Sequence, residues 1–245
     1  MILELDCGNT RIKWRLLQDG AVIQRGSLVT LQEIMSGLQP LFEGQVQRCR
    51  VVSVWSGEAT QALIVGLKAW IGHVECAKPQ KQLLGVTNGY SDYKTLGMDR
   101  WLAVVAAYQK YHEPALIFDF GTALTADYVD ATGQHLGGFI VPGVELMRAS
   151  LCSKTQRIRY SPDNMPALGA INPQLSTISG VEQGLYLMIR GFVEEQKHIA
   201  KRNLGERFHV FVAGGDGQMI IDLFEDVHVA NDLVFDGLAL ACPFE

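Results

Sequence analysis

Residues 115–125 read Ala-Leu-Ile-Phe-Asp-Phe-Gly-Thr-Ala-Leu-Thr, and this stretch decides the fold. A run of apolar, strand-forming residues reaches Asp119, turns at Gly121 and Thr122, and resumes as a second run. Glycine lets backbone N–H groups approach an oxygen closely, and the threonine hydroxyl adds a donor. A carboxylate beside such a turn suits a phosphate or a metal ion. Because aspartate, glycine and threonine are also ordinary turn residues, a plain hairpin is the alternative interpretation.

The pattern occurs twice in the chain. Residues 1–14 read Met-Ile-Leu-Glu-Leu-Asp-Cys-Gly-Asn-Thr-Arg-Ile-Lys-Trp, again a strand, an acidic turn and a second strand. Three pairs of residues share one offset (119 − 6 = 113): Asp6 and Asp119, Gly8 and Gly121, and Gly20 and Gly133. Three matches at one offset predict a duplicated β-meander with an acidic turn in each half.

The composition allows two cores. The chain has 245 residues, enough for one large domain or two of about 120 residues. Hydrophobic residues make up 48% of the chain and charged residues 19%. The net charge is −5 and no basic run stands out, so no nucleic-acid partner is expected. Phosphate ligands remain compatible with this charge, because backbone amides and a metal ion bind them without a basic surface.

The cysteines indicate a reducing environment. They are odd in number and never form a Cys-x-x-Cys pair: Cys7, Cys49, Cys76, Cys152 and Cys242. This spacing argues against a disulfide framework or a zinc site, and a cytoplasmic location is expected. Asp6 and Arg11 interrupt the apolar start, so no secretory signal is predicted. No apolar run reaches the ~18 residues of a membrane span, and no membrane partner is expected.

Strands and helices alternate beyond the meanders. Helices are predicted at 31–41, 58–70, 101–111, 143–150, 181–201, 218–223 and 233–240, and strands at 48–55, 74–77, 209–213 and 227–230. Strand, helix and strand in this order imply right-handed crossovers. The sequence therefore predicts an α/β fold. Residues 78–96 are polar and poorly periodic, as binding loops often are.

Two residues of the first acidic turn each have two interpretations. Strand alternation places Lys13 on the second strand, three residues beyond Thr10, where its ammonium could reach a phosphate or simply face solvent. Cys7 is either a small apolar filler beside a glycine or a nucleophile, and the filler is favoured.

Asp99 and Arg100 precede the most apolar helix predicted in the chain. Aspartate is a favoured N-cap and complements the helix dipole, which explains Asp99 without any function. Arg100 opposes the same dipole, so it is better explained by a carboxylate or phosphate ligand. We therefore interpret Asp99 and Arg100 as a functional pair.

Three further positions are candidates with ordinary alternatives. Tyr90 either walls a substrate pocket or pins the irregular segment. Thr177 either donates to a ligand or caps a helix. Gly214-Gly215, between a strand and a helix, either lets a flat ring lie on bare backbone or forms a tight turn.

Taken in order, the motifs resemble those of the acetate and sugar kinase, heat-shock ATPase and actin superfamily, and in detail the type III pantothenate kinases. The motifs are Asp6-x-Gly8-Asn9-Thr10-x-x-Lys13, Gly97-x-Asp99-Arg100, Asp119-x-Gly121-Thr122-Ala123-x-Thr125 and Gly214-Gly215. The resemblance covers essentially the whole chain. Each motif is weak alone, but the first and third are specific with Gly-x-Asp-Arg between them.

The resemblance implies a fold and a reaction. The fold is two ribonuclease H-like domains, 1–113 and 114–245, each a β-meander with βαβ units, around a nucleotide cleft and usually in a homodimer. The reaction is transfer of the ATP γ-phosphoryl group to the primary hydroxyl of pantothenate, the first step of coenzyme A biosynthesis. The implied cofactors are Mg²⁺ with ATP, and K⁺ or NH₄⁺ as a monovalent cation.

The resemblance also implies residue roles. Asp99 is the general base, Asp119 holds the monovalent cation, and Asp6 helps to place magnesium. ATP contacts fall on Asp6, Cys7, Gly8, Asn9, Thr10, Arg11, Ile12, Lys13 and Thr122. Pantothenate contacts fall on Tyr90, Gly97, Met98, Asp99, Arg100 and Thr177, with Arg100 a natural partner for the substrate carboxylate.

Two other functions stay open. A kinase of the same superfamily acting on another small hydroxyl substrate would share the ATP turns and differ around Tyr90, Arg100 and Thr177. A non-catalytic nucleotide-binding accessory or regulatory protein is the other alternative, although it has no need of three intact carboxylates at Asp6, Asp99 and Asp119.

Overall fold

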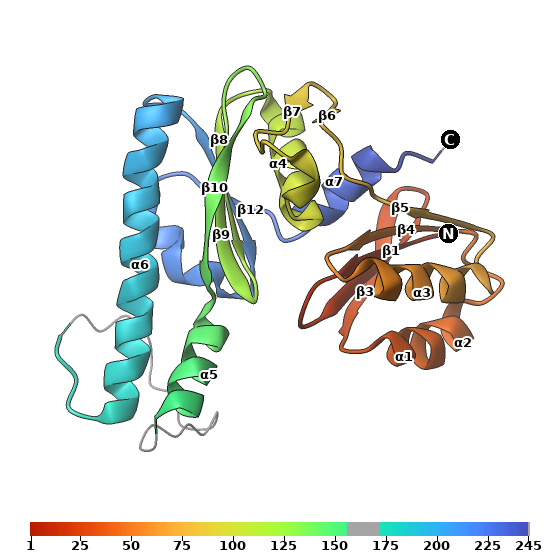
Figure 1. Cartoon of the computed structure of the whole chain (residues 1–245), viewed down its shortest axis with the longest axis horizontal. Helices are drawn as coiled ribbons and strands as arrows, with labels where there is room; N and C mark the ends of the chain where they lie inside the picture. The colour runs from red at the N-terminus through yellow and green to blue at the C-terminus, as the bar shows by residue number, and fades with distance from the viewer. Residues whose placement is uncertain (156–171, 245) are drawn as a thin grey trace. The chain divides into compact units, whose positions relative to one another are not determined.

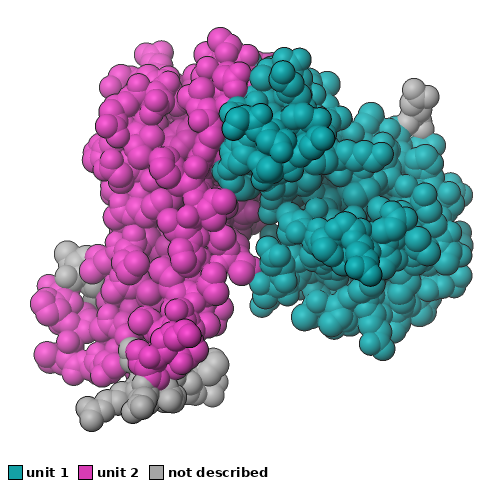
Figure 2. All heavy atoms as spheres, viewed as in Figure 1, with its two compact units in different colours: residues 1–111, 232–245 teal, residues 112–231 magenta. Residues whose placement is uncertain are grey.

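The computed structural model describes residues 1–155 and 172–244. The chain forms two compact units, coloured separately in Figure 2. The first unit contains residues 1–111 and 232–245, and the second contains residues 112–231. The last segment of the chain thus returns to the first unit, whereas the predicted domains place it in the second half.

The first unit is built on a five-stranded sheet of order β3-β2-β1-β4-β5. Its strands are β1 (Ile2–Cys7), β2 (Ile12–Gln18), β3 (Ala21–Leu28), β4 (Arg48–Ser53) and β5 (His73–Cys76). The first three form an antiparallel meander, and β4 and β5 add in parallel. The helices of this layer are α1 (Leu31–Glu33), the π-helical η1 (Ile34–Leu38), α2 (Gln39–Phe42) and α3 (Gly57–Lys68).

The second unit repeats this topology with the order β10-β9-β8-β11-β12. Its strands are β8 (Ala115–Phe120), β9 (Ala123–Val129), β10 (His135–Pro142), β11 (His209–Gly214) and β12 (His228–Val229). Its helices are α5 (Val144–Lys154), α6 (Thr177–Leu204) and the 3₁₀-helix η4 (Gly215–Leu223). Strand directions match those of the first sheet. The predicted α/β fold with a duplicated meander is confirmed.

The duplication extends to the turns. β1 and β8 are offset by 113 residues at both ends (115 − 2 = 113). Gly20 and Gly133 both have a φ of 80°, the left-handed conformation that favours glycine in such turns. The acidic turns differ in length, since residues 8–11 join β1 to β2 whereas only residues 121 and 122 join β8 to β9.

Each sheet buries one face beneath helices. Leu3, Leu5 and Cys7 of β1 are fully buried in the core that α1, η1, α2 and α3 cover. In the second unit, α6 runs along the sheet (Figure 1) and packs Leu185 and Ile189 into the core, four residues apart on one helix face. In both units, apolar residues on one face of the sheet pack against the apolar side of the helices that cover it.

The first unit also contains α4 (Met98–Tyr111) and the C-terminal helix α7 (Leu233–Ala241), which lie side by side (Figure 1). A Cβ atom built on Gly237 would lie 2.1 Å from the carbonyl oxygen of Leu102. The two helices therefore touch through backbone, and only glycine fits at this position of α7.

One buried carboxylate organises the attachment of α7. Glu4 is fully buried and accepts from Arg15 Nε at 2.5 Å and from Arg50 Nη1 at 2.7 Å. Arg15 also pairs with Asp232 and Asp236 at the beginning of α7, each at 3.3 Å. Arg50 Nε donates to the carbonyl oxygen of Cys242, just beyond the end of α7, at 2.7 Å. Glu4 thus orients two arginines that bind opposite ends of one helix.

Replacing Glu4 with glutamine is expected to lower the free energy of unfolding by about 3–5 kcal/mol, because two buried arginines lose the charge that compensates them. Denaturant titration measures this change. Glu58→Gln is the control, since Glu58 is an exposed acid in the first turn of α3 and its loss should cost less than about 1 kcal/mol. Equal unfolding midpoints for the two variants would contradict the role of Glu4.

The structure corrects some predicted boundaries. The helix predicted to stop near Pro40 continues through Phe42, because a proline in the first turn of α2 lacks only an N–H that needs no partner there. The segment predicted to be irregular contains a hairpin, β6 (Gln82–Leu83) and β7 (Val86–Thr87), and a 3₁₀ turn, η2 (Tyr93–Thr95). Strands of two residues are too short for alternation to reveal them.

None of the helices in the described part of the chain combines the length and the apolarity that a membrane span requires.

Candidate active site

The first acidic turn places a carboxylate beside a lysine. Asp6 lies near the end of β1 and is half-buried, and its antiparallel partner on β2 is the exposed Lys13. Directly opposed residues share a face of the sheet, with Cβ atoms about 5 Å apart. The Gly8 N–H donates to the carbonyl oxygen of Arg11 at 3.1 Å and closes the turn. Asn9, like Arg11, is exposed, so the turn presents backbone and polar groups outward.

The segment after β4 supports this turn. Trp55 Nε1 donates to the carbonyl oxygen of Gly8 at 2.8 Å, and the Val54 N–H donates to that of Cys7 at 3.2 Å. Cys7 and Ile12 are fully buried in the core, so only their backbone groups can reach a ligand. Burial raises the pKa of the Cys7 thiol well above its ordinary value, which suits the apolar filler and not a nucleophile.

The second acidic turn meets two glycine turns at one edge of its sheet. Asp119 is half-buried near the end of β8, and Thr122 follows on the exposed turn. The Gly143 N–H donates to the carbonyl oxygen of Thr122 at 3.0 Å, and a Cβ on Gly143 would lie 2.4 Å from the carbonyl oxygen of Gly121. A Cβ on Gly214, whose φ is 90°, would lie 2.2 Å from the carbonyl oxygen of Phe120.

The ends of β8, β10 and β11 therefore touch through backbone without intervening side chains. Carboxyl ends of parallel strands are the usual position of ligands in α/β sheets. Bare backbone at this edge can approach a phosphate or a flat ring closely, as the predicted glycine motifs require. Gly143 was not singled out in the sequence, because Pro142-Gly143 is equally typical of any strand end.

A charged cluster follows these glycine turns. Arg148 of α5 donates from Nε and Nη2 to the buried carboxylate of Glu182 on α6, at 2.9 and 2.8 Å. Arg148 also pairs with Glu145 one turn earlier. Burial raises the pKa of Asp216 on η4, and the nearby Arg148 partly opposes this shift. The bidentate pair fixes α5 against α6. Only the three-residue spacing of Glu145 and Arg148 hinted at this cluster in the sequence.

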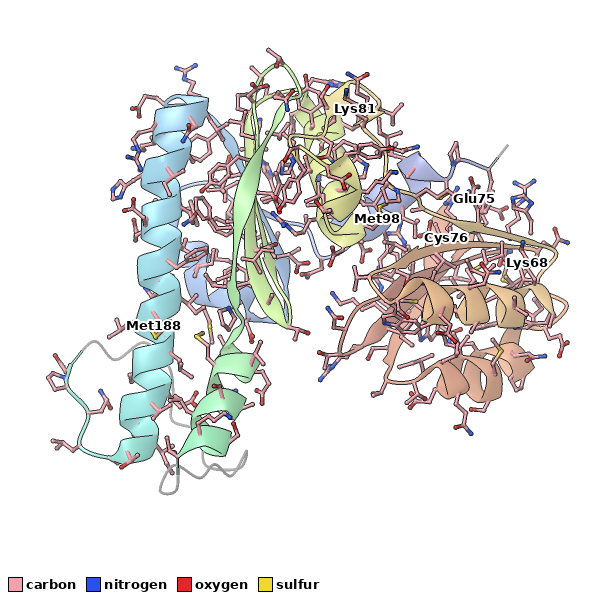
Figure 3. All side chains as sticks on the ribbon, in the orientation of Figure 1. Lys68, Glu75, Cys76, Lys81, Met98 and Met188 are labelled. Atoms are coloured by element: carbon pink, nitrogen blue, oxygen red, sulfur yellow. The ribbon has the colours of Figure 1, made fainter. Side chains whose placement is uncertain are left out.

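The Gly97–Arg100 motif forms the first turn of α4. Because the helix begins at Met98, Asp99 lies inside the first turn and not at the N-cap. Of the two ordinary explanations for Asp99, capping is wrong, whereas the favourable interaction of an acid with the helix dipole remains. Asp99 Oδ1 accepts from the Arg100 N–H at 2.8 Å, and a Cβ on Gly97 would lie 2.7 Å from the same oxygen. Glycine at 97 therefore makes room for the carboxylate. Met98, labelled in Figure 3 at the start of the helix, is buried.

The structure brings Tyr90 and Arg100 together. Arg100 Nη1 donates to the Tyr90 hydroxyl at 2.9 Å, and the guanidinium carbon lies 5.8 Å from the ring centroid. Arg100 is only 7% exposed. A buried arginine at a helix N-terminus is thus held from the side by the tyrosine, next to the Asp99 carboxylate on the same turn.

Thr177 is the first residue of α6 and is exposed. The helix cap is Ser176, whose hydroxyl accepts from the Ser179 N–H at 3.2 Å. The capping alternative for Thr177 is therefore wrong. Within the described residues, no group of three or more His, Cys, Asp or Glu side chains is arranged to hold a metal ion.

Comparison with known proteins decides the family. A family model described as type III pantothenate kinase matches residues 2–199. The chain belongs to the type III pantothenate kinase family. A type III pantothenate kinase of Ectopseudomonas mendocina (strain ymp) is 46% identical over 251 residues, covering 99% of both chains. One of Pseudomonas fluorescens (strain Pf0-1) is 44% identical over 247 residues, again covering 99% of both. The resemblance predicted from the motifs is confirmed.

Solved structures support the fold of this pantothenate kinase family member. A protein of Campylobacter jejuni described as a conserved putative Baf family transcriptional activator is similar with a TM-score of 0.62 and 20% identity, over 98% of this chain and 96% of its own. A putative 2-dehydro-3-deoxygalactonokinase of Sinorhizobium meliloti gives 0.56 and 13%, over 98% of both chains. At these identities the likeness concerns the fold alone, and it agrees with two ribonuclease H-like domains.

Proposed function

We infer that this chain transfers the γ-phosphoryl group of ATP to the primary hydroxyl of pantothenate, forming 4′-phosphopantothenate in the first step of coenzyme A biosynthesis. The observation that carries this conclusion is the family match over residues 2–199. The two acidic turns and the Gly97–Arg100 motif support it, because phosphoryl transfer needs positioning and charge neutralisation more than covalent help.

We propose that the first turn binds the phosphates of ATP. Asn9, Thr10 and Arg11 are exposed polar residues of this turn, Gly8 lets a phosphate approach its backbone closely, and the exposed Lys13 follows on β2. Cys7 and Ile12 contribute backbone groups only, since their side chains are buried. Thr122 supplies the corresponding hydroxyl from the second turn. Such donors stabilise the charge that develops on the transferring phosphoryl oxygens.

The donor chemistry fits the proposed metal ions. Kinase chemistry implies ATP with a divalent metal, and we propose Mg²⁺ at Asp6. Mg²⁺ is commonly bound through one or two carboxylates together with phosphates and water, so a single carboxylate in each turn suits it better than a cage of side chains. We propose that the Asp119 carboxylate holds a monovalent cation, K⁺ or NH₄⁺. When bound, the metal ions would neutralise phosphate charge.

We propose that Asp99 is the general base and that its neighbours bind pantothenate. The Arg100 N–H fixes one oxygen of the Asp99 carboxylate, so the side chain keeps one orientation while it accepts the proton of the substrate hydroxyl. The hydroxyl oxygen then attacks the γ-phosphorus, and ADP leaves. Arg100 binds the pantothenate carboxylate. Tyr90, Gly97, Met98 and Thr177 complete the substrate contacts.

The remaining proposals concern organisation. We propose a homodimer in the cytoplasm and two ribonuclease H-like domains, 1–113 and 114–245, as the units of the ancestral duplication. Light scattering of the purified protein tests the dimer, since a single species of about twice the chain mass of 27.0 kDa is expected.

Purified protein is expected to release ADP when it is given ATP, Mg²⁺ and pantothenate, and faster with K⁺ than with a bulky organic cation at equal ionic strength. A coupled ADP-release assay measures the rate, and mass spectrometry of the product confirms phosphopantothenate. A panel of other primary alcohols serves as the control for the acceptor. Turnover of another alcohol in preference to pantothenate would overturn the substrate, and nucleotide binding without turnover of any acceptor would overturn the kinase.

A further inference from the structure

The loop that carries Tyr90 is hydrogen-bonded to the buried side-chain amide of Asn88. Asn88 follows β7 directly and is only 6% exposed. Its own N–H donates to the carbonyl oxygen of Lys81 at 2.9 Å, across the hairpin. Gln109 of α4 donates to the carbonyl oxygen of Leu84 at the hairpin tip. Asn88 is therefore bonded to the hairpin, and the hairpin in turn is bonded to the helix that carries Asp99.

Both polar groups of the Asn88 side chain are used within the loop. Its Oδ1 accepts from the Tyr90 N–H at 3.0 Å, and its Nδ2 donates toward the carbonyl oxygen of Tyr93 at 3.4 Å. Only this orientation of the amide satisfies both partners, because one is a donor and the other an acceptor. A buried side chain that bonds the backbone two residues ahead fixes the direction in which that residue leaves the turn.

The direction of Tyr90 matters because its hydroxyl accepts from Arg100 Nη1 at 2.9 Å. A hydroxyl in a fixed position orients the plane of the Arg100 guanidinium. This orientation matters because arginine binds a carboxylate with two parallel hydrogen bonds that lie in the guanidinium plane. A continuous chain of contacts thus runs from the Asn88 amide through the Tyr90 backbone and ring to the Arg100 guanidinium.

We propose that Asn88 is a positioning residue for the carboxylate end of the substrate, which it serves by holding Tyr90 and, through Tyr90, the plane of Arg100. This inference rests on the proposed function, in which Arg100 binds the pantothenate carboxylate. The hydrogen bonds of the Asn88 side chain go to Tyr90 and Tyr93 of this loop, so we expect its effect to fall on pantothenate and not on ATP.

Asn88→Leu keeps the volume of the side chain and removes both hydrogen bonds. It is expected to raise the KM for pantothenate about five- to tenfold, because a factor of this size corresponds to the loss of one hydrogen bond. The KM for ATP is expected to stay within about twofold of the wild-type value. Asn88→Asp keeps an oxygen that can accept from the Tyr90 N–H but turns a second oxygen toward the carbonyl oxygen of Tyr93, so it should recover only part of the affinity. Asp92→Ala is the control, because exposed Asp92 caps only the Lys94 N–H of the same loop.

Wild-type turnover of pantothenate is measured first, so its absence would reject the proposed function and this inference with it. With an active wild type, an unchanged pantothenate KM in Asn88→Leu would overturn the positioning role. An equal rise in both KM values would also overturn it, since it would show a general loosening of the fold. If Asn88→Leu does not fold, Tyr90→Phe and Asn88→Asp decide the question. The proposal requires each of them to raise the pantothenate KM while the KM for ATP stays within about twofold of the wild-type value.

Discussion

Replacing Asp99 with asparagine is expected to lower kcat by about 10²–10⁴-fold, the usual contribution of a general base. Asparagine keeps an oxygen at the position that accepts from the Arg100 N–H at 2.8 Å, and it matches the shape that Gly97 accommodates. The variant cannot accept the hydroxyl proton. Its free energy of unfolding should therefore stay within about 1 kcal/mol of the wild type, because the hydrogen bond from the Arg100 N–H is kept.

ADP release and denaturant unfolding, measured on the same preparation, separate these two effects. Asp92→Asn provides the matched control, since Asp92 is an exposed acid whose hydrogen bonds go to Lys94 and Thr95, which are not among the proposed site residues. Retention of full turnover by Asp99→Asn would refute the base assignment. A large loss of stability would instead show that the carboxylate charge supports the helix.

Replacing Gly214 with alanine is expected to destabilise the protein by about 2–6 kcal/mol. Its backbone, at φ 90° and ψ 158°, lies in a region that is almost restricted to glycine and costs about 1–3 kcal/mol for other residues. The new Cβ would also meet the carbonyl oxygen of Phe120 at 2.2 Å, and overpacking costs a further ~1–3 kcal/mol. The expected loss is a large part of the 5–15 kcal/mol that typically stabilises a domain.

Gly215→Ala is a control one residue away on the same turn. A Cβ there meets nothing within 4 Å, and the residue has an ordinary φ, so stability should change by less than about 1 kcal/mol. Urea titration of both variants measures the difference. Similar unfolding midpoints would show that the backbone where β8 and β11 meet can move to accommodate a Cβ atom. The close backbone contact at Gly214 would then not be required for stability.

The sequence predicted the features that depend on neighbouring residues. Asp6 and Asp119 lie near the ends of their strands, before equivalent turns. These positions were predictable because strand alternation and turn glycines are local sequence signals, which both copies of the meander retain. The dipole argument predicted Asp99 and Arg100 to be a functional pair, and this stays a prediction. The structure adds Tyr90 as a hydrogen-bond partner of Arg100.

Features that join distant residues were not predictable in this way. Arg15 alternates with apolar residues just as a solvent-facing strand residue does, yet it is buried against Glu4, and its partner Asp232 is 217 positions away. Asn88 looked like any loop asparagine, because its burial depends on a hairpin too short to be seen in the sequence. Helix starts are uncertain by one or two residues, which is why Asp99 was interpreted as a possible cap.

The return of residues 232–245 to the first unit has a consequence for synthesis on the ribosome. The carboxylate of Glu4 and the guanidinium of Arg15 are translated early, but the acidic end of α7 that completes their network is translated only after the whole second unit. The first unit is made in two parts, because all of residues 112–231 are translated between them. We expect the N-terminal sheet to stay incompletely closed, and exposed to proteases and chaperones, until α7 has been translated and has emerged from the ribosome.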